Sequence, residues 1–462
     1  MLNSLYSIIS SKNITCSKFF LHHSKNIDFE HIAKTCSFIK RQRNLSPRAF
    51  TQTLIEAAGG GLQFNFAKMC RRYCFLSDKS MKEKSFHSRL ISDTTTDFIN
   101  RIYSIYFKSL FHNFYSYKGK ILLTNFQSRG LDIDEILCID GTYWNVSNDL
   151  AHIFPGARKR RKEAESKILQ YGDKVFKNAQ IGLQTTYSVV SGFIKSAVVS
   201  SATASERDYV EFKGQKSLII MDAGYLNYTL LKQISDNGCY FMIRGKGNMT
   251  GNIIDCMLDG EKYHDFIGKN LNEPIVRNYA LNKTLDMKVK LSNGFIVRVL
   301  RVYSKAKGQI SFLISNIMHN TFTAKDLSLI QKIRWSIEIF FKCLKSGVNL
   351  RGIKTKYVSL VYTLLFASMI AALLKQFIYS VISKANNRLY TKDTSILKIY
   401  NSSLNYYFDL LRCIFQNKYD DFLELMLKII QNSKIYNKSP QAKSKITAHK
   451  TFDSIVHHFI KK

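Results

Sequence analysis

The chain contains one long uncharged apolar run, and this run limits the folds available to the whole sequence. Residues 357–374 (YVSLVYTLLFASMIAALL) carry no charged side chain over about 18 residues, which is long enough to span a membrane or to form a helix inside a protein core. Tyr, Ser and Thr occur on several faces of the predicted helix, and the run stands alone in the chain. The sequence therefore favours a buried core helix and no membrane partner.

The charge balance indicates a polyanionic partner. Lys and Arg number 68 against 34 Asp and Glu, so the formal net charge is +34. An excess of this size favours nucleic acid or an anionic membrane surface as the partner. The Lys-rich usage of an AT-rich genome explains part of the Lys content, but it does not explain the scarcity of carboxylates. We therefore expect the protein to bind nucleic acid.

The size and the cysteine content place the chain among large reduced proteins. Its 462 residues, 45% of them hydrophobic, can build two or three domains with cores of their own. Nine Cys lack paired spacing, and the closest two, Cys70 and Cys74, have no His cluster beside them. Zinc and a disulfide framework are therefore not expected, and a cytoplasmic location fits best. The N-terminus shows no secretory signal.

The N-terminal part of the sequence is helical and basic in pattern. Ser46 followed by Pro47 forms an N-cap with Pro at the first helical position, and an apolar periodic run follows. The glycines at 59–61 end that predicted helix. A helix-turn-helix and a plain helical bundle both remain open for this region.

From about residue 134 the pattern changes to strands. The run EILCIDGTYWNV reads as an apolar strand that ends in Asp140, and KSLIIMDAGY as another that ends in Asp222. Between them, residues 179–201 alternate, turn at Ser-Gly and alternate again, which predicts a hairpin. Strand-like pieces fill much of 245–317, and a helix is expected to begin near Thr323.

That last helix contains a carboxylate within the stretch RWSIEIFFKCLKSG. On a wheel of 100° per residue, Glu338 lies with Arg334, Lys345 and Gln331 inside about 60°. The apolar side chains occupy a separate face; they are Ile330, Ile333, Ile337, Phe340, Phe341 and Leu344. The apolar face is therefore expected to dock on the sheet, with the polar stripe at its margin, where a cleft would open.

Three carboxylates in this order predict a metal site. Asp140 and Asp222 each stand at the end of an apolar strand, where neighbouring strands can bring their carboxylates together, and Glu338 is expected on the cleft side of its helix. Clustered carboxylates can hold two divalent ions that activate a nucleophile at a phosphodiester. Oxygen ligands select Mg²⁺ or Mn²⁺ over zinc. Arg334 and Lys345 would then hold phosphates beside the metals.

The helix also carries a known signature. The chain resembles the DDE transposases of bacterial insertion sequences, of the insertion-sequence-4 type, with their Tyr-x2-Arg-x3-Glu-x6-Lys motif. Arg334, Glu338 and Lys345 match it in residue and spacing, and Trp335 suits the pattern. The Tyr position falls on Gln331, which could still hydrogen-bond a phosphate but lacks the phenol ring.

The resemblance covers most of the chain. The surroundings of Asp140 (CIDGTYW) and Asp222 (LIIMDAGYLNYTLLKQISDNGCYFMIR) are similar to the first and second acidic motifs of the family, and RQRNLSPRAF matches more loosely. It implies an α/β protein with an RNase H-like catalytic core and a strand-rich insertion. The expected parts are a helical DNA-binding domain (1–125), the first part of the catalytic domain (126–244), the insertion (245–317), the second part of the catalytic domain with the Glu helix (318–385), and C-terminal helices with a basic tail (386–462).

The resemblance also implies a function. Members of the family cut an element out of DNA and paste it elsewhere, through freed 3′ ends, hairpin ends and strand transfer. It implies double-stranded transposon ends and target DNA as partners, a homodimer that pairs two ends, and a bacterial, nucleoid-associated location. The DNA-contacting candidates are Arg334, Lys345, Gln331, Trp335 and the basic run Arg158, Lys159, Arg160, Arg161 and Lys162. A solvated charged surface is the alternative for the basic run.

Three readings of the whole chain stay open at this point. The first is an active transposase. The second is a catalytically silent DNA-binding protein derived from one, for which Gln331 is the main indication. The third is a membrane-associated basic protein, which depends on residues 357–374 alone. Divalent-dependent nicking separates the first two, and cell fractionation tests the third.

Overall fold

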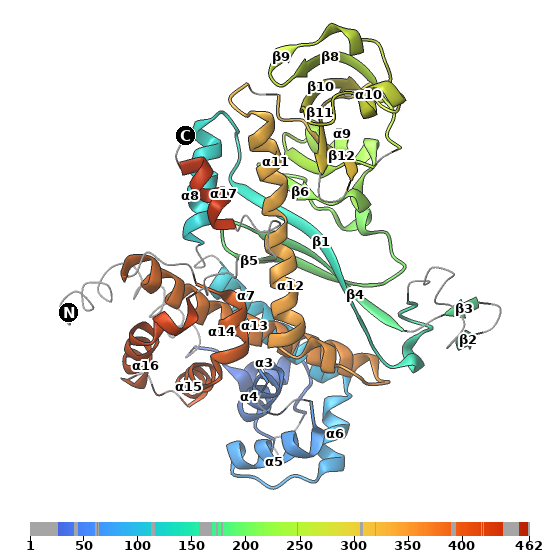
Figure 1. Ribbon diagram of the computed structural model, residues 1–462. Helices are drawn as coiled ribbons and strands as arrows, with labels where there is room; N and C mark the ends of the chain where they lie inside the picture. Colours follow the sequence, from blue (N-terminus) through green and yellow to red (C-terminus); the bar gives the residue numbers. More distant parts are fainter. Residues whose placement is uncertain are drawn as a thin grey trace.

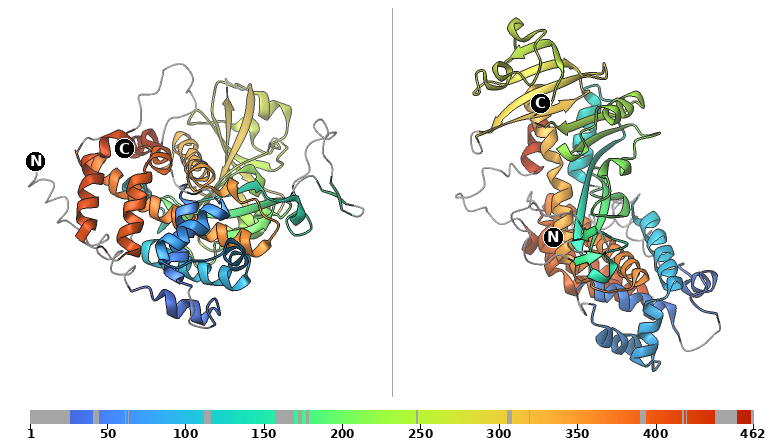
Figure 2. Two further views of the ribbon diagram at one scale, coloured as in Figure 1. Left: turned by 90° about the horizontal axis from the view of Figure 1, so that it is seen from below. Right: turned by 90° about the vertical axis from the view of Figure 1, so that its right-hand side faces the viewer.

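The computed structural model is a mixed α/β protein built on one large sheet, with helices gathered mainly at one end (Figure 1). Figure 2 shows the molecule from below and from its right-hand side, and the second of these views shows the same elongated arrangement. The structure describes residues 26–40, 45–60, 62, 64–111, 116–156, 169–171, 174–176, 179–246, 248–304, 308–318, 320–389, 394–416, 418, 420–437 and 452–460.

Within these residues the main sheet has ten strands. In spatial order they are β5 (Phe193–Ser201), β4 (Gln180–Ser188), β1 (Glu135–Asn145), β6 (Ser217–Met221), β7 (Tyr240–Arg244), β12 (Gln309–Ser315), β11 (Ile296–Ser304), β10 (Leu285–Lys290), β8 (Asn252–Leu258) and β9 (Glu261–Lys262). The pairs β1–β6 and β6–β7 are parallel, and the other pairs are antiparallel. Because β12 pairs with β7, the strands of the 245–317 segment extend the central sheet. A separate small ribbon joins β2 (Leu169–Tyr171) and β3 (Lys174–Phe176).

The helices fall into groups along the chain. The N-terminal group is α3 (Phe29–Thr35), α4 (Pro47–Ala58), α5 (Phe66–Ser77), α6 (Glu83–Leu90), α7 (Asp93–Phe111) and α8 (Tyr117–Ser128). The central helices are α9 (Tyr228–Asp236), α10 (Pro274–Asn278), α11 (Ala324–Ile333), α12 (Trp335–Gly347) and α13 (Val358–Leu389). The C-terminal group is α14 (Ile396–Ser402), α15 (Leu404–Phe415), α16 (Asp420–Gln431) and α17 (Phe452–Ile460).

Helix α13 is the core of the helical end. It packs against α4 and α7 from the N-terminal group and against α14, α15 and α16 from the C-terminal group (Figure 1). Among the described residues, one helix, Val358–Asn386, is long and apolar enough to cross a membrane, but 78% of its most apolar window is buried inside the protein. The prediction of a buried core helix is therefore confirmed.

Local signals in the sequence correspond to observed element ends. Ser46 caps α4 by accepting a hydrogen bond from the Ala49 backbone N–H, and Pro47 is its first residue. The predicted hairpin is β4–β5, with Gly192 at φ +75° in its turn. Gly238, also at φ +75°, follows α9. Glycine adopts this left-handed conformation without steric cost, so these turns were predictable.

Two predicted boundaries differ from the structure. Strand β1 does not end at Asp140 but continues to Asn145. The reason is that β4 pairs with β1 as far as Asn145, which lies opposite Gln180. The helix that begins after Thr323 is divided at Arg334 into α11 and α12. The division leaves the two helices in line along the sheet (Figure 1), so the predicted apolar face stays on one side and is buried.

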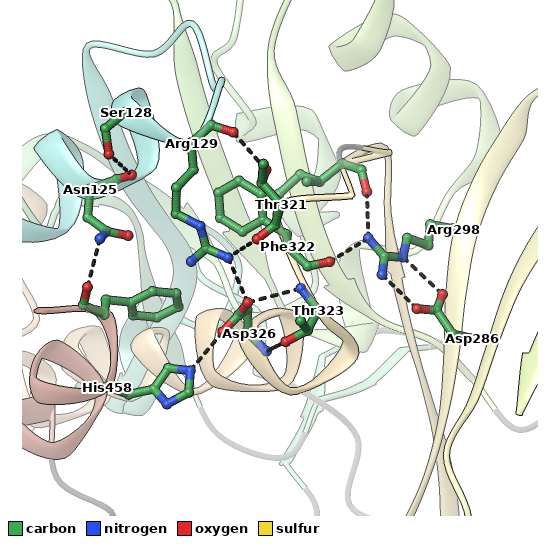
Figure 3. A network of polar contacts seen from close by, with 12 residues as sticks. Asn125, Ser128, Arg129, Asp286, Arg298, Thr321, Phe322, Thr323, Asp326 and His458 are labelled. Atoms are coloured by element: carbon green, nitrogen blue, oxygen red, sulfur yellow. Dashed lines mark hydrogen bonds and ion pairs between the residues drawn. The ribbon is translucent and has the colours of Figure 1, made fainter. Parts of the chain in front are cut away.

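A buried polar junction holds the start of α11. Asp326 is fully buried; its carboxylate accepts hydrogen bonds from Arg129 at 2.7 Å and from His458 Nε2 at 2.7 Å, and it accepts one from the Thr323 backbone (Figure 3). The three partners come from the end of α8, from α17 and from the N-cap of α11 itself. Nearby, Arg298 of β11 pairs with Asp286 and donates to the Phe322 carbonyl (Figure 3). Strand β11 and the C-terminal helix α17 thus meet at the segment that leads into the Glu338 helix.

We expect Asp326→Ala to lower the free energy of unfolding by about 3–5 kcal/mol, because it leaves the Arg129 guanidinium largely buried without its carboxylate. Burial acts to raise the pKa of Asp326, but the hydrogen bonds from Arg129, His458 and Thr323 outweigh it and hold the pKa below its ordinary value. The folded carboxyl therefore binds its proton less readily than the unfolded one. Its stabilisation is complete above about pH 4 and is lost as the pH falls further.

Chemical denaturation at pH 7 and at pH 3 tests this. The difference between wild type and the variant should shrink at the lower pH. Asp236→Ala is the control, because Asp236 forms an exposed pair with Lys232 on α9 and should change stability by less than about 1 kcal/mol. Equal effects of the two substitutions would contradict a structural role for the junction.

Candidate active site

The two predicted aspartates come to the same level of the sheet. Strands β1 and β6 run parallel, and the last paired residues are Cys138 and Ile220. Extending this register by two residues places Asp140 opposite Asp222, the residue that directly follows β6. Neighbouring strands are about 4.8 Å apart, and side chains at one level of a parallel pair point to the same face. The register therefore brings both carboxylates to the same level on one face of the sheet.

Arg334 joins Asp140 to Glu338. Its Nη1 lies 3.0 Å from Asp140 Oδ2, and its Nη2 lies 2.6 Å from Glu338 Oε1. The Arg334 side chain is 16% exposed and those of Asp140 and Glu338 are 19% and 27% exposed, so the arrangement is largely enclosed. It lies at the margin of the buried face of α12, as the helical wheel predicted. The geometry thus places the first and third predicted carboxylates around one cation.

Burial changes the acid–base behaviour of Asp140. It raises the pKa of this carboxyl to about 6, against the opposing effect of Arg334 and of the Gly141 backbone N–H. Glu206 and Glu338 add to the rise, because negative charges nearby disfavour a further carboxylate. Several carboxylates therefore lie close enough to influence one another.

Gln331 lies one turn before Arg334 and is turned toward the second aspartate. Its Nε2 donates to the carbonyl oxygen of Met221 at 3.0 Å. Met221 is the last residue of β6 and directly precedes Asp222. Within the described residues, Gln331 Oε1 is buried without a hydrogen-bond partner. Gln331, at the family's Tyr position, thus binds the protein backbone through its amide nitrogen. A contact between Gln331 and a phosphate stays a prediction.

The remaining predicted residues on α12 lie in different environments. Lys345 is half-buried; burial and Arg351 lower its pKa, while the charge of Asp140 acts to raise it. Lys345 follows Glu338 by seven residues, about two turns of α12, so the two lie on the same side of the helix. Trp335 is 37% exposed, with Lys342 Nζ 5.0 Å from the centre of its ring. An exposed indole beside a cation can stack on a nucleobase.

The basic run Arg158 to Lys162 lies outside the described residues, so its predicted contact with DNA stays a prediction.

The sequence did not predict one neighbour of the site, Glu206. Glu206 follows β5 in the short helix η3 (Glu206–Tyr209), and its carboxylate accepts a hydrogen bond from Tyr143 of β1 at 2.7 Å. No spacing in the sequence connects it to Asp140, because the folding of the β1–β4–β5 ribbon brings the two together.

The donor chemistry of the site fits a hard divalent cation. Asp140, Asp222 and Glu338 offer only carboxylate oxygens, which suit Mg²⁺ or Mn²⁺. As their side chains stand, however, the described residues contain no group of three that could hold a metal ion. Two of the three carboxylates instead point to Arg334. Each of these two contacts uses one carboxylate oxygen, Asp140 Oδ2 and Glu338 Oε1, so Arg334 does not engage the other oxygen of either group.

A family model and the sequence relatives of this chain indicate its class. Residues 132–374 match the profile of the family described as transposase DDE domain. The chain is 20% identical to the transposase for insertion sequence element IS1151 of Clostridium perfringens, over 91% of this chain and 92% of that protein. It is 22% identical to the transposase for insertion sequence element IS231C of Bacillus thuringiensis subsp. berliner, over 69% of this chain and 70% of that protein. A solved structure of the piggyBac transposase synaptic complex with hairpin DNA is similar at 13% identity and a TM-score of 0.42, over 94% of this chain and 88% of that chain.

The protein belongs to the transposase DDE domain family, because the matched residues make up more than half of the chain. The predicted class, a transposase related to those of bacterial insertion sequences, is confirmed. Enzymes of this family act in DNA transposition and generally use divalent metal ions. The assignment to the insertion-sequence-4 type stays a prediction.

The raised pKa of Asp140 predicts how the stability of the protein changes with pH. The folded carboxyl has a pKa of about 6, above the ordinary value of about 3.9 for an unfolded Asp. The native state therefore binds more protons than the unfolded state between about pH 4 and pH 6, so this residue costs stability as the pH rises through that range. We expect Asp140→Asn, which cannot ionise, to gain stability relative to wild type from pH 4.5 to pH 7.5.

Thermal unfolding of the two proteins at several pH values measures this difference. The same substitution at Asp132, an exposed residue paired with Lys216, is the control and should show no such trend. A constant difference between Asp140→Asn and wild type across the range would show that burial does not raise the pKa of Asp140.

Proposed function

We propose that the protein is a DNA transposase of the insertion-sequence-4 type that binds the ends of its element and catalyses metal-dependent cleavage and strand transfer. The observation that carries the proposal is the arrangement around Arg334: Asp140 and Glu338 share its guanidinium, and Asp222 lies level with Asp140 on the neighbouring strand. The partners are double-stranded transposon ends and target DNA, and a homodimer would pair two ends. The proposed location is the bacterial cytoplasm, at the nucleoid.

The sheet topology supports an RNase H-like catalytic core. Its order β5-β4-β1-β6-β7, with β5, β4 and β1 antiparallel and β1, β6 and β7 parallel, places the two aspartates at the middle of the sheet. Helices α11 and α12 then return the chain across this sheet with Glu338. The division into parts at 125, 244, 317 and 385, which the resemblance implies, is part of the same proposal.

Each residue has a proposed role in this function. Asp140, Asp222 and Glu338 would hold two Mg²⁺ or Mn²⁺ ions, which supply activation of a water or hydroxyl nucleophile and stabilisation of the leaving oxygen. Arg334 orients Asp140 and Glu338 through its two hydrogen bonds and binds a phosphate of the element's end. Lys345 adds positive charge beside it, and Trp335 offers its exposed ring to a base.

A second candidate is a catalytically silent DNA-binding protein derived from a transposase. The observation that favours it is at Gln331, whose amide nitrogen is occupied by the Met221 carbonyl. If this position has lost its contact with DNA, end binding would be weaker than in relatives with Tyr. The three carboxylates are nevertheless all present, and for this reason the active enzyme is the first proposal.

The experiment that separates the two candidates is strand cleavage by purified protein in Mg²⁺. The substrate is duplex DNA carrying the element's own ends. Wild type should cut, and Asp140→Ala, Asp222→Ala and Glu338→Ala should each lose cleavage by at least about a thousandfold while they retain DNA. Removing a proposed metal ligand eliminates activation of the nucleophile but few phosphate contacts. Glu261→Ala, an exposed carboxylate of β9, is the matched control.

A wild-type protein that binds the ends without cutting them would support the silent candidate. Cleavage that survives in one of the three variants would remove that residue from the proposed triad.

Arg334→Ala and Lys345→Ala should behave differently from the carboxylate variants. Both side chains are proposed to hold phosphates of the ends, so both substitutions should impair end cleavage and hairpin formation more than binding to random DNA. We expect a loss of about tenfold or more in cleavage, since a charge-assisted contact contributes about 1.5–3 kcal/mol. A gel assay of end binding and nicking measures both effects.

Lys325→Ala is the control on the preceding helix, because Lys325 is an exposed cation in the first turn of α11. Normal cleavage by Arg334→Ala and Lys345→Ala would contradict the proposal that these side chains hold phosphates of the ends, and Arg334 and Glu338 would then form an ion pair without a role in cleavage.

A further inference from the structure

A second polar cluster lies against the strand segment that carries Asp140. Its central contact joins Tyr143 Oη of β1 to Glu206 Oε1 of η3, at 2.7 Å. Successive side chains of a strand point to opposite faces, so Tyr143 and Gly141 lie on the face of β1 opposite to Asp140. Arg334 therefore contacts Asp140 from one face of the sheet, while Glu206 approaches the same strand from the other.

Two glycines show how close the Glu206 carboxylate lies to the backbone that follows each aspartate. A Cβ at Gly141 would lie 2.8 Å from Glu206 Oε1, and a Cβ at Gly224 would lie 3.2 Å from Glu206 Oε2. Gly141 directly follows Asp140, and Gly224 is the second residue after Asp222. The carboxylate thus fits between the segments that follow the two aspartates, in space that a side chain on Gly141 would fill.

Both sides of this contact are themselves held in place. Gln184 of β4 donates from Nε2 to Tyr143 Oη at 3.0 Å, and it is 3% exposed. On the other side, Arg207, the neighbour of Glu206 in η3, donates from Nε to the Gly224 carbonyl at 3.1 Å. The cluster therefore connects β4, β1 and η3 to η4 (Ala223–Tyr225), the short helix that begins directly after Asp222.

We propose that Glu206, oriented by the hydrogen bond from Tyr143, is a positioning residue that sets the separation of Asp140 and Asp222. The inference rests on the proposed function, because it treats these two aspartates as the metal-binding pair. Glu206 acts on them through the backbone that follows each one. A hydrogen-bond acceptor at this place is sufficient for the role, and its negative charge is not required.

The direct test is Mn²⁺ binding to the full chain without DNA, measured by electron paramagnetic resonance. Glu206→Ala should weaken Mn²⁺ binding about tenfold or more, which is the usual effect of losing a residue that orients metal ligands. Tyr143→Phe should weaken it to a similar extent. The double variant should be no worse than either single one, because both substitutions remove the same contact. Glu206→Gln, which keeps an acceptor oxygen for Tyr143, should bind Mn²⁺ within about threefold of wild type.

Glu211→Ala is the matched control, since it removes the same charge from an exposed position five residues further along the chain, and it should bind Mn²⁺ as wild type does. Cleavage of element ends by the same proteins gives a second measurement, and it should fall in parallel with Mn²⁺ affinity. The thermal unfolding temperature identifies any variant that fails to fold. If Glu206→Ala fails to fold, the Mn²⁺ affinities of Glu206→Gln and Tyr143→Phe test the inference in its place.

Mn²⁺ binding by Glu206→Ala equal to that of wild type would overturn the inference. So would a loss in Glu206→Gln as large as that in Glu206→Ala, because the charge would then be what matters. The proposed function fails separately: a wild type that binds Mn²⁺ but does not cut ends contradicts catalysis, whereas the Mn²⁺ affinities of the variants still decide the role of Glu206.

Discussion

The shared guanidinium of Arg334 is the interaction on which the candidate site depends. Carboxylates brought together in a partly enclosed place repel one another, and a cation between them offsets that cost. Arg334 is this cation: its guanidinium donates to Asp140, which lies on β1, and to Glu338, which lies on α12. It can do so only because α11 and α12 lie in line across the sheet (Figure 1). Arg334 stands between the two helices and so lies level with Asp140, where β1 extends beyond the last paired residue of β6.

The position of these helices is in turn set by contacts that come from distant parts of the chain. At the start of α11, Asp326 receives hydrogen bonds from Arg129 and His458. At the end of α12, the buried Lys375 Nζ donates to the Gly347 carbonyl and also to the Gly59 and Tyr400 carbonyls. Both ends of the helix pair are thus tied to the N-terminal and C-terminal groups. Such buried charged groups are costly unless every partner is in place, so they favour one arrangement of the helices over others.

Much of the fold was predictable because its signals are local. The cap at Ser46, the hairpin turn at Gly192 and the core helix 357–374 each follow from a few neighbouring residues, and the structure contains all three. The two helix and strand boundaries that differ, at Asn145 and Arg334, depend on pairing with other elements. For the site, the sequence predicted which carboxylates to consider and the side of the helix that carries Glu338. It did not predict that Arg334 would contact Asp140, since 194 residues separate them.

The sequence by itself determined the elements, the order of the acidic residues along them and the class of protein, because periodicity, caps and motif spacing are properties of short segments. The tertiary structure alone decided which side chains meet. Gln331 contacts the backbone before Asp222, and Glu206 lies between the glycines that follow the two aspartates. The physical reason is that these contacts arise from strand register and helix docking, which depend on how the whole core packs and leave no regular spacing in the sequence.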